Sequence, residues 1–570
     1  AKSNYLQLGG VHKYETVDLD YDVYQSYAET DYPGTREIAY TARGIGFTIE
    51  KRDNPYFPYV TQTAGPDVRD LNTYQSNTYN STIRNSKDRY IGAAFNATKR
   101  FDTLAPSWVK SGVRIRQQKR DLTDNSYRGN YVGPDGVMGI NPVTGLNDDN
   151  LAQFGRGYPV PDTELSRYAT LPYANFPGEG RVGIDQIFAQ SPQLFKPDVA
   201  RNVQTELTGL QRFEETITAA YIMGNVDLGK LSVMGGLRVE ETEVVGEGAL
   251  QYLSPEEKAR RAAWVGPVTD AELERRNREE YGRRQTSEGK TRDIFPGLHF
   301  KYTPVRNLIT RLSYATNIGR PGIGQLIPRT TVNDDNQTIS TTNPNLKAQR
   351  ADNFDLSVEY YFEPAGVISA GVFLKEIDRF IYTASGAVVG SGPDNGFGGN
   401  YVGYTLTTQY NGGSARVRGL ELNYNQQFTH LPGFWSGFGA YATYTKMDIE
   451  GDYESGGGLQ STSEVPGFNP MTANAGISYI RGKITVRLQY NYTDEFLSSY
   501  NASQARLWYT IRRRTVDVKT MYRLTDKIDA YLDFNNIFDE PDSGSEWFNG
   551  RARNIKEMSP LVSLGMNFRL

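Results

Sequence analysis

Apolar and polar side chains alternate with a period of two residues along much of this chain. Apolar residues recur at alternate positions in four clear examples, residues 17–23, 231–239 (where Gly235 interrupts the series), 484–490 and 528–534. Because successive side chains of a β-strand point to opposite faces, each such segment has one apolar and one polar face. No run approaches the roughly 18 apolar residues of a membrane-spanning helix. The alternation therefore predicts an all-β chain and excludes a helical membrane protein.

The connections between the predicted strands alternate between short and long. The short ones are residues 101–107, 226–230, 304–307, 362–366, 429–434, 481–483 and 523–527. The long ones are residues 121–210, 245–293, 317–351, 383–401, 447–469, 494–505 and 536–556. Outer-membrane barrels have short periplasmic turns and long extracellular loops, whereas a soluble β-sandwich has no physical reason to keep its long loops at one end. We therefore expect a transmembrane antiparallel β-barrel.

The number of predicted strands is odd. We count about 19, and the first strand, near Tyr5–Val11, runs in the same direction as the last. A bacterial barrel with both ends in the periplasm has an even number of strands. We therefore expect residues 1–570 to lack an odd number of leading strands. If the complete barrel has 22 strands, about three are absent.

The composition excludes several classes of protein. The 570 residues include no Cys and 3 His, which rules out thiol catalysis and a disulfide scaffold and argues against a histidine-rich metal site. A net charge of −4 lacks the basic character of a nucleic-acid-binding protein. An aromatic content of 12% is too high for a disordered chain. We expect neither a nucleic-acid partner nor a cofactor.

Catalytic motifs are missing as well. The chain contains no G-x-S-x-G, no P-loop and no H-E-x-x-H. Its three histidines, His12, His299 and His430, are not tied by spacing to any serine and acid. The sequence therefore predicts that the protein is not an enzyme.

The long loop at residues 246–293 carries two signals for the start of a helix. Ser254–Glu257 and Thr269–Glu272 both have the pattern of a capping box, and Lys, Arg, Glu and Ala follow each. We expect an extracellular loop insert with two short helices. A solvated, charged insert is the simpler interpretation, and a docking surface for a substrate or partner is the alternative.

Several charged residues on the predicted strands occupy the polar face, which lines the barrel interior. These are Arg114, Arg116, Arg238, Glu240, Glu421 and Arg487. In a plugged barrel they would meet the plug, and in an open barrel they would line a wet channel. The simpler interpretation is a charged wall with no role in substrate binding.

The long loops are rich in Tyr, Asn, Asp and Gly, for example at residues 386–404 and 448–458. Aromatic and amide side chains can stack on and hydrogen-bond a sugar or an aromatic iron chelate. The segments Asn147–Asn150 and Asn333–Asn336 offer oxygen ligands that suit Ca²⁺. Neither has EF-hand spacing, so we favour simple solvated loops there and assign no substrate-binding residues.

The chain ends in a strand pattern. Leu564, Met566, Phe568 and Leu570 share one face, and Ser563 and Gly565 lie on the other. Chain ends usually fray unless they are paired. The segment resembles the C-terminal β-signal of outer-membrane proteins, for which Ser563, Gly565, Phe568 and Leu570 would be the signal residues. The final Leu570 departs from the Phe that the signal favours, and an ordinary edge strand is the alternative.

The chain resembles the barrel of a TonB-dependent outer-membrane receptor over about residues 5–570. The segments that carry the resemblance are Glu215–Gly224, Gly235–Glu240, Gly319–Pro321, Leu326–Pro328, Asn343–Leu346, Asn353–Tyr360, Gly419–Leu422 and Asn535–Asp539. The resemblance implies a 22-stranded barrel closed by an N-terminal plug, with a short box that the periplasmic TonB protein pulls. Neither the plug nor the box is found here, so we expect both to be missing from residues 1–570.

The resemblance implies an active importer in the outer membrane of a Gram-negative bacterium. Its cargo would be a scarce or large nutrient of the siderophore or oligosaccharide class. Its partners would be outer-membrane lipid, TonB, the barrel-assembly machinery and the small-molecule or oligosaccharide substrate. The alternative is a plugless passive porin, or a structural barrel completed by a partner.

Overall fold

The structure is a computed structural model. It describes residues 2–32, 36–50, 59–68, 70–103, 105–150, 152, 158–159, 177–178, 188–334, 336–393, 395–455, 458–462, 464–499, 504–546, 552–556 and 558–569. None of the described helices is long and apolar enough to cross a bilayer.

The described strands form one sheet of 22 strands and four small sheets. Seventeen of the 22 are joined edge to edge in chain order, each antiparallel to the next. These are β1 (Lys2–Lys13), β2 (Val17–Tyr32), β7 (Arg84–Phe101), β8 (Ser107–Asp124), β13 (Gln211–Leu228), β14 (Leu231–Leu250), β15 (Arg283–Val305), β16 (Leu308–Gly319), β19 (Gln349–Phe362), β20 (Gly366–Asp378), β23 (Ser414–Gln427), β24 (Phe438–Ser455), β26 (Met471–Arg481), β27 (Ile484–Thr493), β30 (Arg513–Thr525), β31 (Ile528–Asn535) and β34 (Leu561–Phe568).

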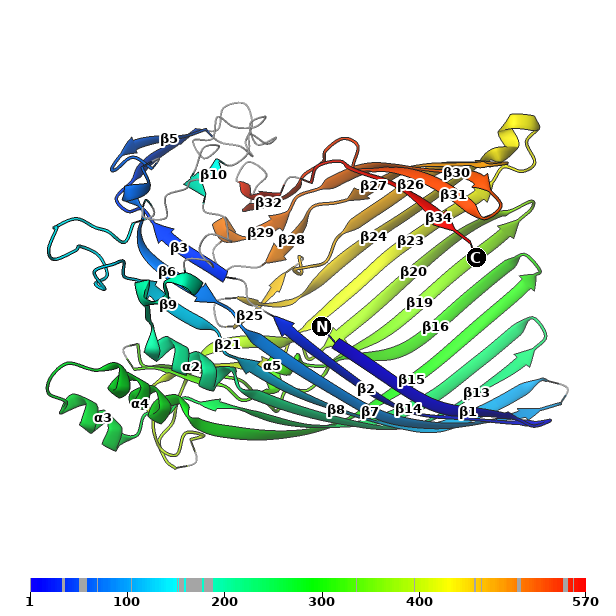
Figure 1. Ribbon diagram of the computed structural model, residues 1–570. Helices are drawn as coiled ribbons and strands as arrows, with labels where there is room; N and C mark the ends of the chain where they lie inside the picture. The colour runs from blue at the N-terminus through cyan, green and yellow to red at the C-terminus, as the bar shows by residue number, and fades with distance from the viewer. Residues whose placement is uncertain are drawn as a thin grey trace.

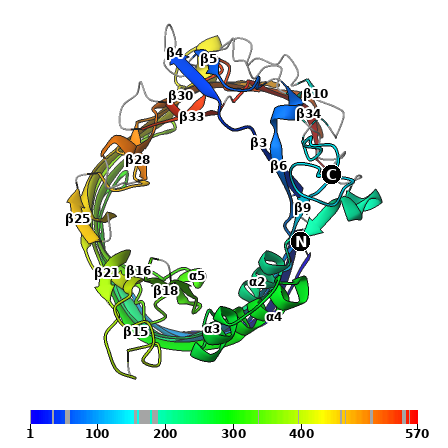
Figure 2. The same cartoon turned by 90° about the vertical axis from the view of Figure 1, so that its left-hand side faces the viewer.

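The other five strands of the large sheet belong to loops. They are β17 (Thr330–Asn333), β18 (Thr338–Thr341), β21 (Ile381–Val388), β22 (Thr405–Asn411) and β25 (Gly458–Thr462). The sequence-based count of about 19 lies between the 17 wall strands and the 22 strands of the whole sheet. The wall curves into a ring, as Figure 2 shows. Within the described residues, β1 pairs only with β2, and β34 pairs only with β31.

Short turns and long loops lie at opposite ends of the wall (Figure 1). Each of the seven short connections expected from the sequence is a turn between neighbouring wall strands. The loop end carries the helices α2 (Val199–Gly209), α3 (Pro255–Ala262) and α4 (Asp270–Tyr281). Its small sheets contain β3 (Arg36–Thr41), β4 (Gly46–Glu50), β5 (Tyr59–Ala64), β6 (Gln75–Ser81), β9 (Tyr127–Tyr131), β10 (Tyr158–Pro159), β11 (Pro177–Gly178), β12 (Phe195–Pro197), β28 (Phe496–Ser499), β29 (Trp508–Thr510), β32 (Asp542–Glu546) and β33 (Ala552–Lys556).

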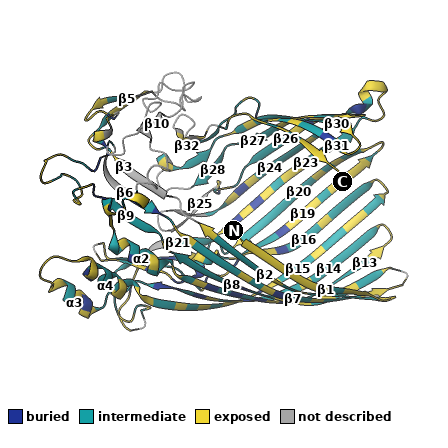
Figure 3. Cartoon of the chain, viewed as in Figure 1, coloured by how far each residue is buried: buried dark blue, intermediate teal, exposed yellow. Residues whose placement is uncertain are grey.

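The two faces of the wall differ in polarity. On β27, Ile484, Leu488 and Tyr490 point to one face and are exposed, while Arg487 and Gln489 point to the other. Exposed and intermediate residues accordingly alternate along the strands in Figure 3. A face of exposed aliphatic side chains is costly in water and suits the hydrocarbon of a bilayer.

The polar face is the inner one. The connection between β16 and β19 folds into the ring, where Figure 2 shows the short helix α5 (Ile323–Leu326). Leu326 of α5 is buried against Phe213 of the wall, and Val244 packs on the same cluster. The register places Phe213 on the face that also carries Arg116 and Glu215. The lumen is therefore lined by the polar half of the alternation.

One cluster of aromatic side chains lies at the end with the short turns. Phe434 and Trp435, in a 3₁₀ turn before β24, are more than half exposed. The Phe434 ring lies 4.9 Å from the Tyr479 ring, and the Trp435 ring lies 5.7 Å from the Phe438 ring, between centroids. Exposed aromatic clusters of this kind form the girdles at which barrels meet the lipid headgroups.

Candidate functional site

The lumen wall carries an ion-pair triad. Glu240 of β14 accepts from the guanidinium of Arg238 at 2.6 Å and from Arg320 at 2.6 Å. Arg238 is on the same strand, two residues away, so it shares the inner face with Glu240. Arg320 comes from the start of the inward-folded connection that contains α5. The triad therefore fastens that connection to the wall.

Two further ion pairs surround the same region. Arg116 of β8 donates to the Glu215 carboxylate at 3.0 Å. Asp293 of β15 lies 3.5 Å from the Arg379 guanidinium. Both carboxylates are buried, so their pairing offsets the cost of removing charge from water. Glu215, Asp293 and Arg320 line a cavity of about 200 Å³ beneath α5.

The six sequence-predicted wall charges divide into two groups. The register places all six on the face that carries Glu215 and Phe213. The structure brings Arg116, Arg238 and Glu240 into the ion pairs above. Arg114, Glu421 and Arg487 are exposed on that face and have no ion pair within the described part of the chain. Of the six, only Arg116, Arg238 and Glu240 therefore take part in ion pairs among the described residues of the lumen wall.

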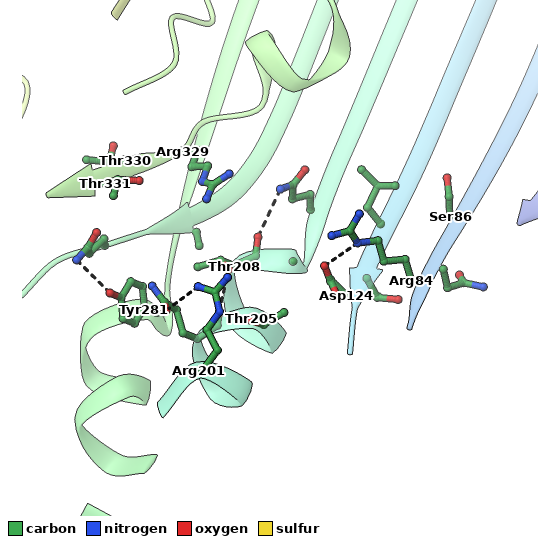
Figure 4. A pocket seen from close by; sticks show the side chains of 18 of the residues that line it. Arg84, Ser86, Asp124, Arg201, Thr205, Thr208, Tyr281, Arg329, Thr330 and Thr331 are labelled. Carbon is green, nitrogen blue, oxygen red and sulfur yellow. Dashed lines mark hydrogen bonds and ion pairs between the residues drawn. The ribbon is translucent and has the colours of Figure 1, made fainter. Parts of the chain in front are cut away.

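A larger hollow opens at the loop end, between α2, α4 and the ends of the neighbouring strands (Figure 4). Its volume is about 450 Å³. Most of the residues that line it carry a hydroxyl, amide or guanidinium group. The labelled residues in Figure 4 are Arg84, Ser86, Asp124, Arg201, Thr205, Thr208, Tyr281, Arg329, Thr330 and Thr331.

The hollow has an excess of positive charge. Arg84 donates to Asp124 at 2.9 Å, so those two charges cancel. Arg201 bonds only weakly to Gln204 at 3.4 Å, and Arg329 has no ion pair among the described residues. Figure 4 shows both guanidinium groups pointing into the hollow. Two uncompensated guanidiniums beside several hydroxyls suit an anionic, oxygen-rich ligand.

Local signals explain the elements that frame the hollow. Asp198 caps α2 by accepting from the amide of Arg201, which fixes the first turn and the position of that side chain. On the opposite side, burial and the neighbouring Glu280 raise the pKa of Tyr281 to about 12. The Tyr281 hydroxyl therefore stays protonated at neutral pH and accepts from the Gln251 amide at 3.2 Å.

The insert at residues 246–293 contains α3 and α4, which begin after Ser254 and Thr269. Each of these side chains accepts from the amide three residues later, at Glu257 and Glu272. These two glutamates are buried and bind four arginines between the helices, namely Arg260, Arg261, Arg275 and Arg276. Burial opposes their ionisation, but hydrogen bonds from the arginines hold the pKa of both glutamates below the usual value. Ion pairs thus join the two helices of the insert.

The two Asp-rich segments differ. Asp334 pairs with Lys258 at 3.3 Å and accepts from the Tyr404 hydroxyl, and Asp335 lies outside the described residues. Asp148 and Asp149 instead lie close to Asp135, with one oxygen of each within 4.8 Å of the others. Burial and these two neighbours raise the pKa of Asp149 to about 6.

The proposed assembly residues lie on β34. Ser563 and Gly565 face inward opposite Asp533 and Tyr531, and Phe568 faces outward and is exposed. Leu570 lies outside the described residues. The three histidines lie apart, with His12 on β1, His299 on β15 and His430 in the turn before β24.

Sequence reasoning missed Arg201, Arg320 and Arg329, which all come from long connections. The motif Gly319–Pro321 contains Arg320 and carries part of the family resemblance, so it is the one sequence signal for any of the three. Loop residues have no regular periodicity, so the sequence does not indicate which way their side chains point. Their partners become visible only when the wall register is known.

Comparisons with known proteins agree with this fold. The family model described as TonB dependent receptor-like, beta-barrel, matches residues 12–537. A comparison with curated proteins gives no match. Similar solved structures include the ferric-catecholate import receptor Fiu from E. coli K12, with TM-score 0.58 and 14% identity, and P. aeruginosa FpvA bound to pyoverdines, with TM-score 0.54 and 13% identity. The copper transporter OprC is similar with TM-score 0.52 and 12% identity. Each likeness covers 99% of this chain, which spans 64%, 56% and 65% of those chains respectively.

Proposed function

Because the chain belongs to the family of TonB-dependent receptor β-barrels, we propose that the protein imports an anionic chelate across the outer membrane. The family consists of transporters and receptors of the Gram-negative outer membrane rather than of enzymes. The family match over residues 12–537 is the observation that carries the proposal. The exposed apolar outer face and the aromatic cluster before β24 support a place in the outer membrane, surrounded by lipid.

The rim hollow supports the choice of substrate class within the siderophore or oligosaccharide range. The uncompensated Arg201 and Arg329 favour a ligand that carries negative charge, as ferric chelates do, over a neutral sugar. The ferric-catecholate receptor and the pyoverdine-binding FpvA share the fold. In this proposal the hollow is the first contact of the substrate on the extracellular side.

The energy source follows from the family. TonB would deliver it from the inner membrane through a plug, against which the inner wall charges would lie. The barrel-assembly machinery would insert the protein, with β34 as its signal. The alternative, a passive porin or a partner-completed barrel, predicts diffusion without an energy source.

The experiment uses the full-length protein in a Gram-negative host that lacks its own ferric-catecholate receptors. We expect uptake of radioactive iron from a ferric catecholate in cells with TonB and none in cells without it. Purified full-length protein should also give almost no conductance in a planar bilayer. TonB-independent uptake together with large steady conductance would contradict the importer and support the porin.

A further inference from the structure

Three carboxylates converge in the loop that follows β9. One oxygen from each of Asp135, Asp148 and Asp149 lies within 4.8 Å of the other two. Asp135 is separated from the other two by more than ten residues, and the loop returns to it through the β-bridge between Ile140 and Asn147. The fold thus gathers like charges that would repel one another in isolation.

In each carboxylate, one oxygen accepts a hydrogen bond and the other has no hydrogen-bond partner among the described residues. Asp135 accepts from the amide of Val137 at 2.9 Å, and Asp149 accepts from the amide of Gly139 at 2.6 Å. Asp148 accepts from the side-chain amide of Asn141 at 2.9 Å. The second oxygen of every one of these carboxylates is buried and has no hydrogen-bond partner in the described part of the chain. Such orphaned charged atoms are costly unless something else binds them.

Two of the side chains are almost completely buried. Asp149 is 1% exposed and Asn150 is 4% exposed. The Asn150 side-chain oxygen also has no partner, although its amide donates to the Asn147 carbonyl at 2.8 Å. Among the described residues, no lysine or arginine forms an ion pair with Asp135, Asp148 or Asp149. Within the part of the chain that the structure describes, the negative charge of the cluster is therefore not cancelled by an ion pair.

Gly133 lies close to the free oxygen of Asp149. A Cβ at this position would lie 2.8 Å from the Asp149 Oδ1 and 3.7 Å from the Asp148 Cγ. Gly133 also has a positive φ of 60°, which L side chains rarely adopt. The backbone of Gly133 thus approaches the cluster closely, and a side chain at this position would collide with the Asp149 carboxylate.

We propose that this loop binds one Ca²⁺ ion through Asp135, Asp148 and Asp149. All donors are oxygens, which suit a hard cation and do not suit Zn²⁺, which prefers nitrogen and sulfur ligands. Ca²⁺ tolerates the irregular geometry of a loop better than Mg²⁺, which demands near-octahedral ligands. The ion ties the return of the loop at residues 147–150 to its start beside β9.

The test is calorimetry of the EDTA-stripped, full-length protein with CaCl₂. We expect one site with a dissociation constant on the order of 10⁻⁴–10⁻³ M, as in other extracellular modules. MgCl₂ should bind more weakly. Asp149→Asn and, separately, Asp148→Asn should each weaken Ca²⁺ binding by about tenfold or more, which corresponds to about 1.4 kcal/mol. Asp334→Asn, in the other Asp-rich segment, is the matched control and should bind as the wild type does.

Amide exchange of residues 133–150 separates a metal ligand from a structural aspartate. In EDTA, the amides of residues 133–150 should exchange more slowly in Asp149→Asn than in the wild type, because one of three repelling charges is gone. In about 5 mM CaCl₂ the order should reverse, because only the wild type gains the ion. An absence of heat with CaCl₂, equal binding by both variants and the wild type, or faster exchange of Asp149→Asn in both buffers would each overturn the proposal.

Discussion

At the scale of residues, Glu240 shows how one wall carboxylate organises its surroundings. It binds Arg238 on its own strand and Arg320 from the connection that holds α5. Because Glu240 is largely buried, each hydrogen bond from a guanidinium contributes more than a surface ion pair would. The connection is held at this end by charge, and through Leu326 by apolar packing.

Arg320→Ala should loosen this connection without unfolding the barrel. The loss of a charged hydrogen bond to Glu240 costs about 1.5–3 kcal/mol. We therefore expect amide exchange of residues 320–327 to accelerate by about tenfold or more. Arg311→Ala is the control, since it breaks an ion pair with Glu359 elsewhere on the inner wall. Unchanged exchange in residues 320–327 of Arg320→Ala would show that packing alone holds the connection.

The double variant Arg201→Ala and Arg329→Ala tests the anion preference of the rim hollow. Without the two uncompensated guanidiniums, we expect the dissociation constant for a ferric catecholate to rise about tenfold or more. The measurement is ligand titration of the purified full-length protein. Arg292→Ala removes an arginine that is paired with Glu241 and lies outside the hollow, and it should leave the affinity unchanged. Equal losses in both proteins would point to a general charge effect instead.

At the scale of elements, charged side chains form the contact between α3 and α4. Their interface consists of two buried glutamates that each bind three arginines. Trp264 lies between Arg260 and Arg276, with guanidinium-to-ring distances of 5.3 and 5.5 Å. Such a network keeps two short helices ordered on a solvated surface, where an isolated helix of this length is marginal.

The last wall strand, β34, gives a second test at this scale. Phe568→Asp places a charge on the outward face of the strand that we propose the assembly machinery reads. We expect this variant to be absent from the outer membrane, and Phe568→Leu to be inserted normally. The measurement is immunodetection in separated outer-membrane fractions. A normal surface level of Phe568→Asp would rule out this residue as part of an assembly signal.

At the scale of the whole molecule, the two faces of the wall meet different solvents. Leu488 points outward, and its neighbour Gln489 points inward opposite Asp517. Leu488→Arg should reduce the free energy of unfolding by about 2–4 kcal/mol if it lies near the bilayer midplane. Gln489→Arg meets a wet lumen and the Asp517 carboxylate, so its effect should be much smaller. Urea unfolding in lipid vesicles measures both, and equal effects would contradict the assignment of the faces.

The sequence by itself determined the barrel, its turns and its faces. The two-residue period places Arg487 and Gln489 opposite Leu488 and Tyr490 whatever the partner strand is, because the direction of a strand side chain is a local property. The turn lengths are equally local, and the helix starts at Ser254 and Thr269 depend on residues three positions apart. These features needed no knowledge of the rest of the molecule.

The partners of the charged residues were decided only by the tertiary structure. The sequence placed Glu240 on the polar face, but Arg320 reaches it because a long connection folds into the lumen. It flagged Asn147–Asn150 as oxygen-rich, but Asp135 joins that segment only through the path of the loop. Arg201 and Arg329 share one hollow although more than a hundred residues separate them. Contacts of this kind depend on register and loop path, which arise when the wall curves into a ring, and no short stretch of sequence encodes them.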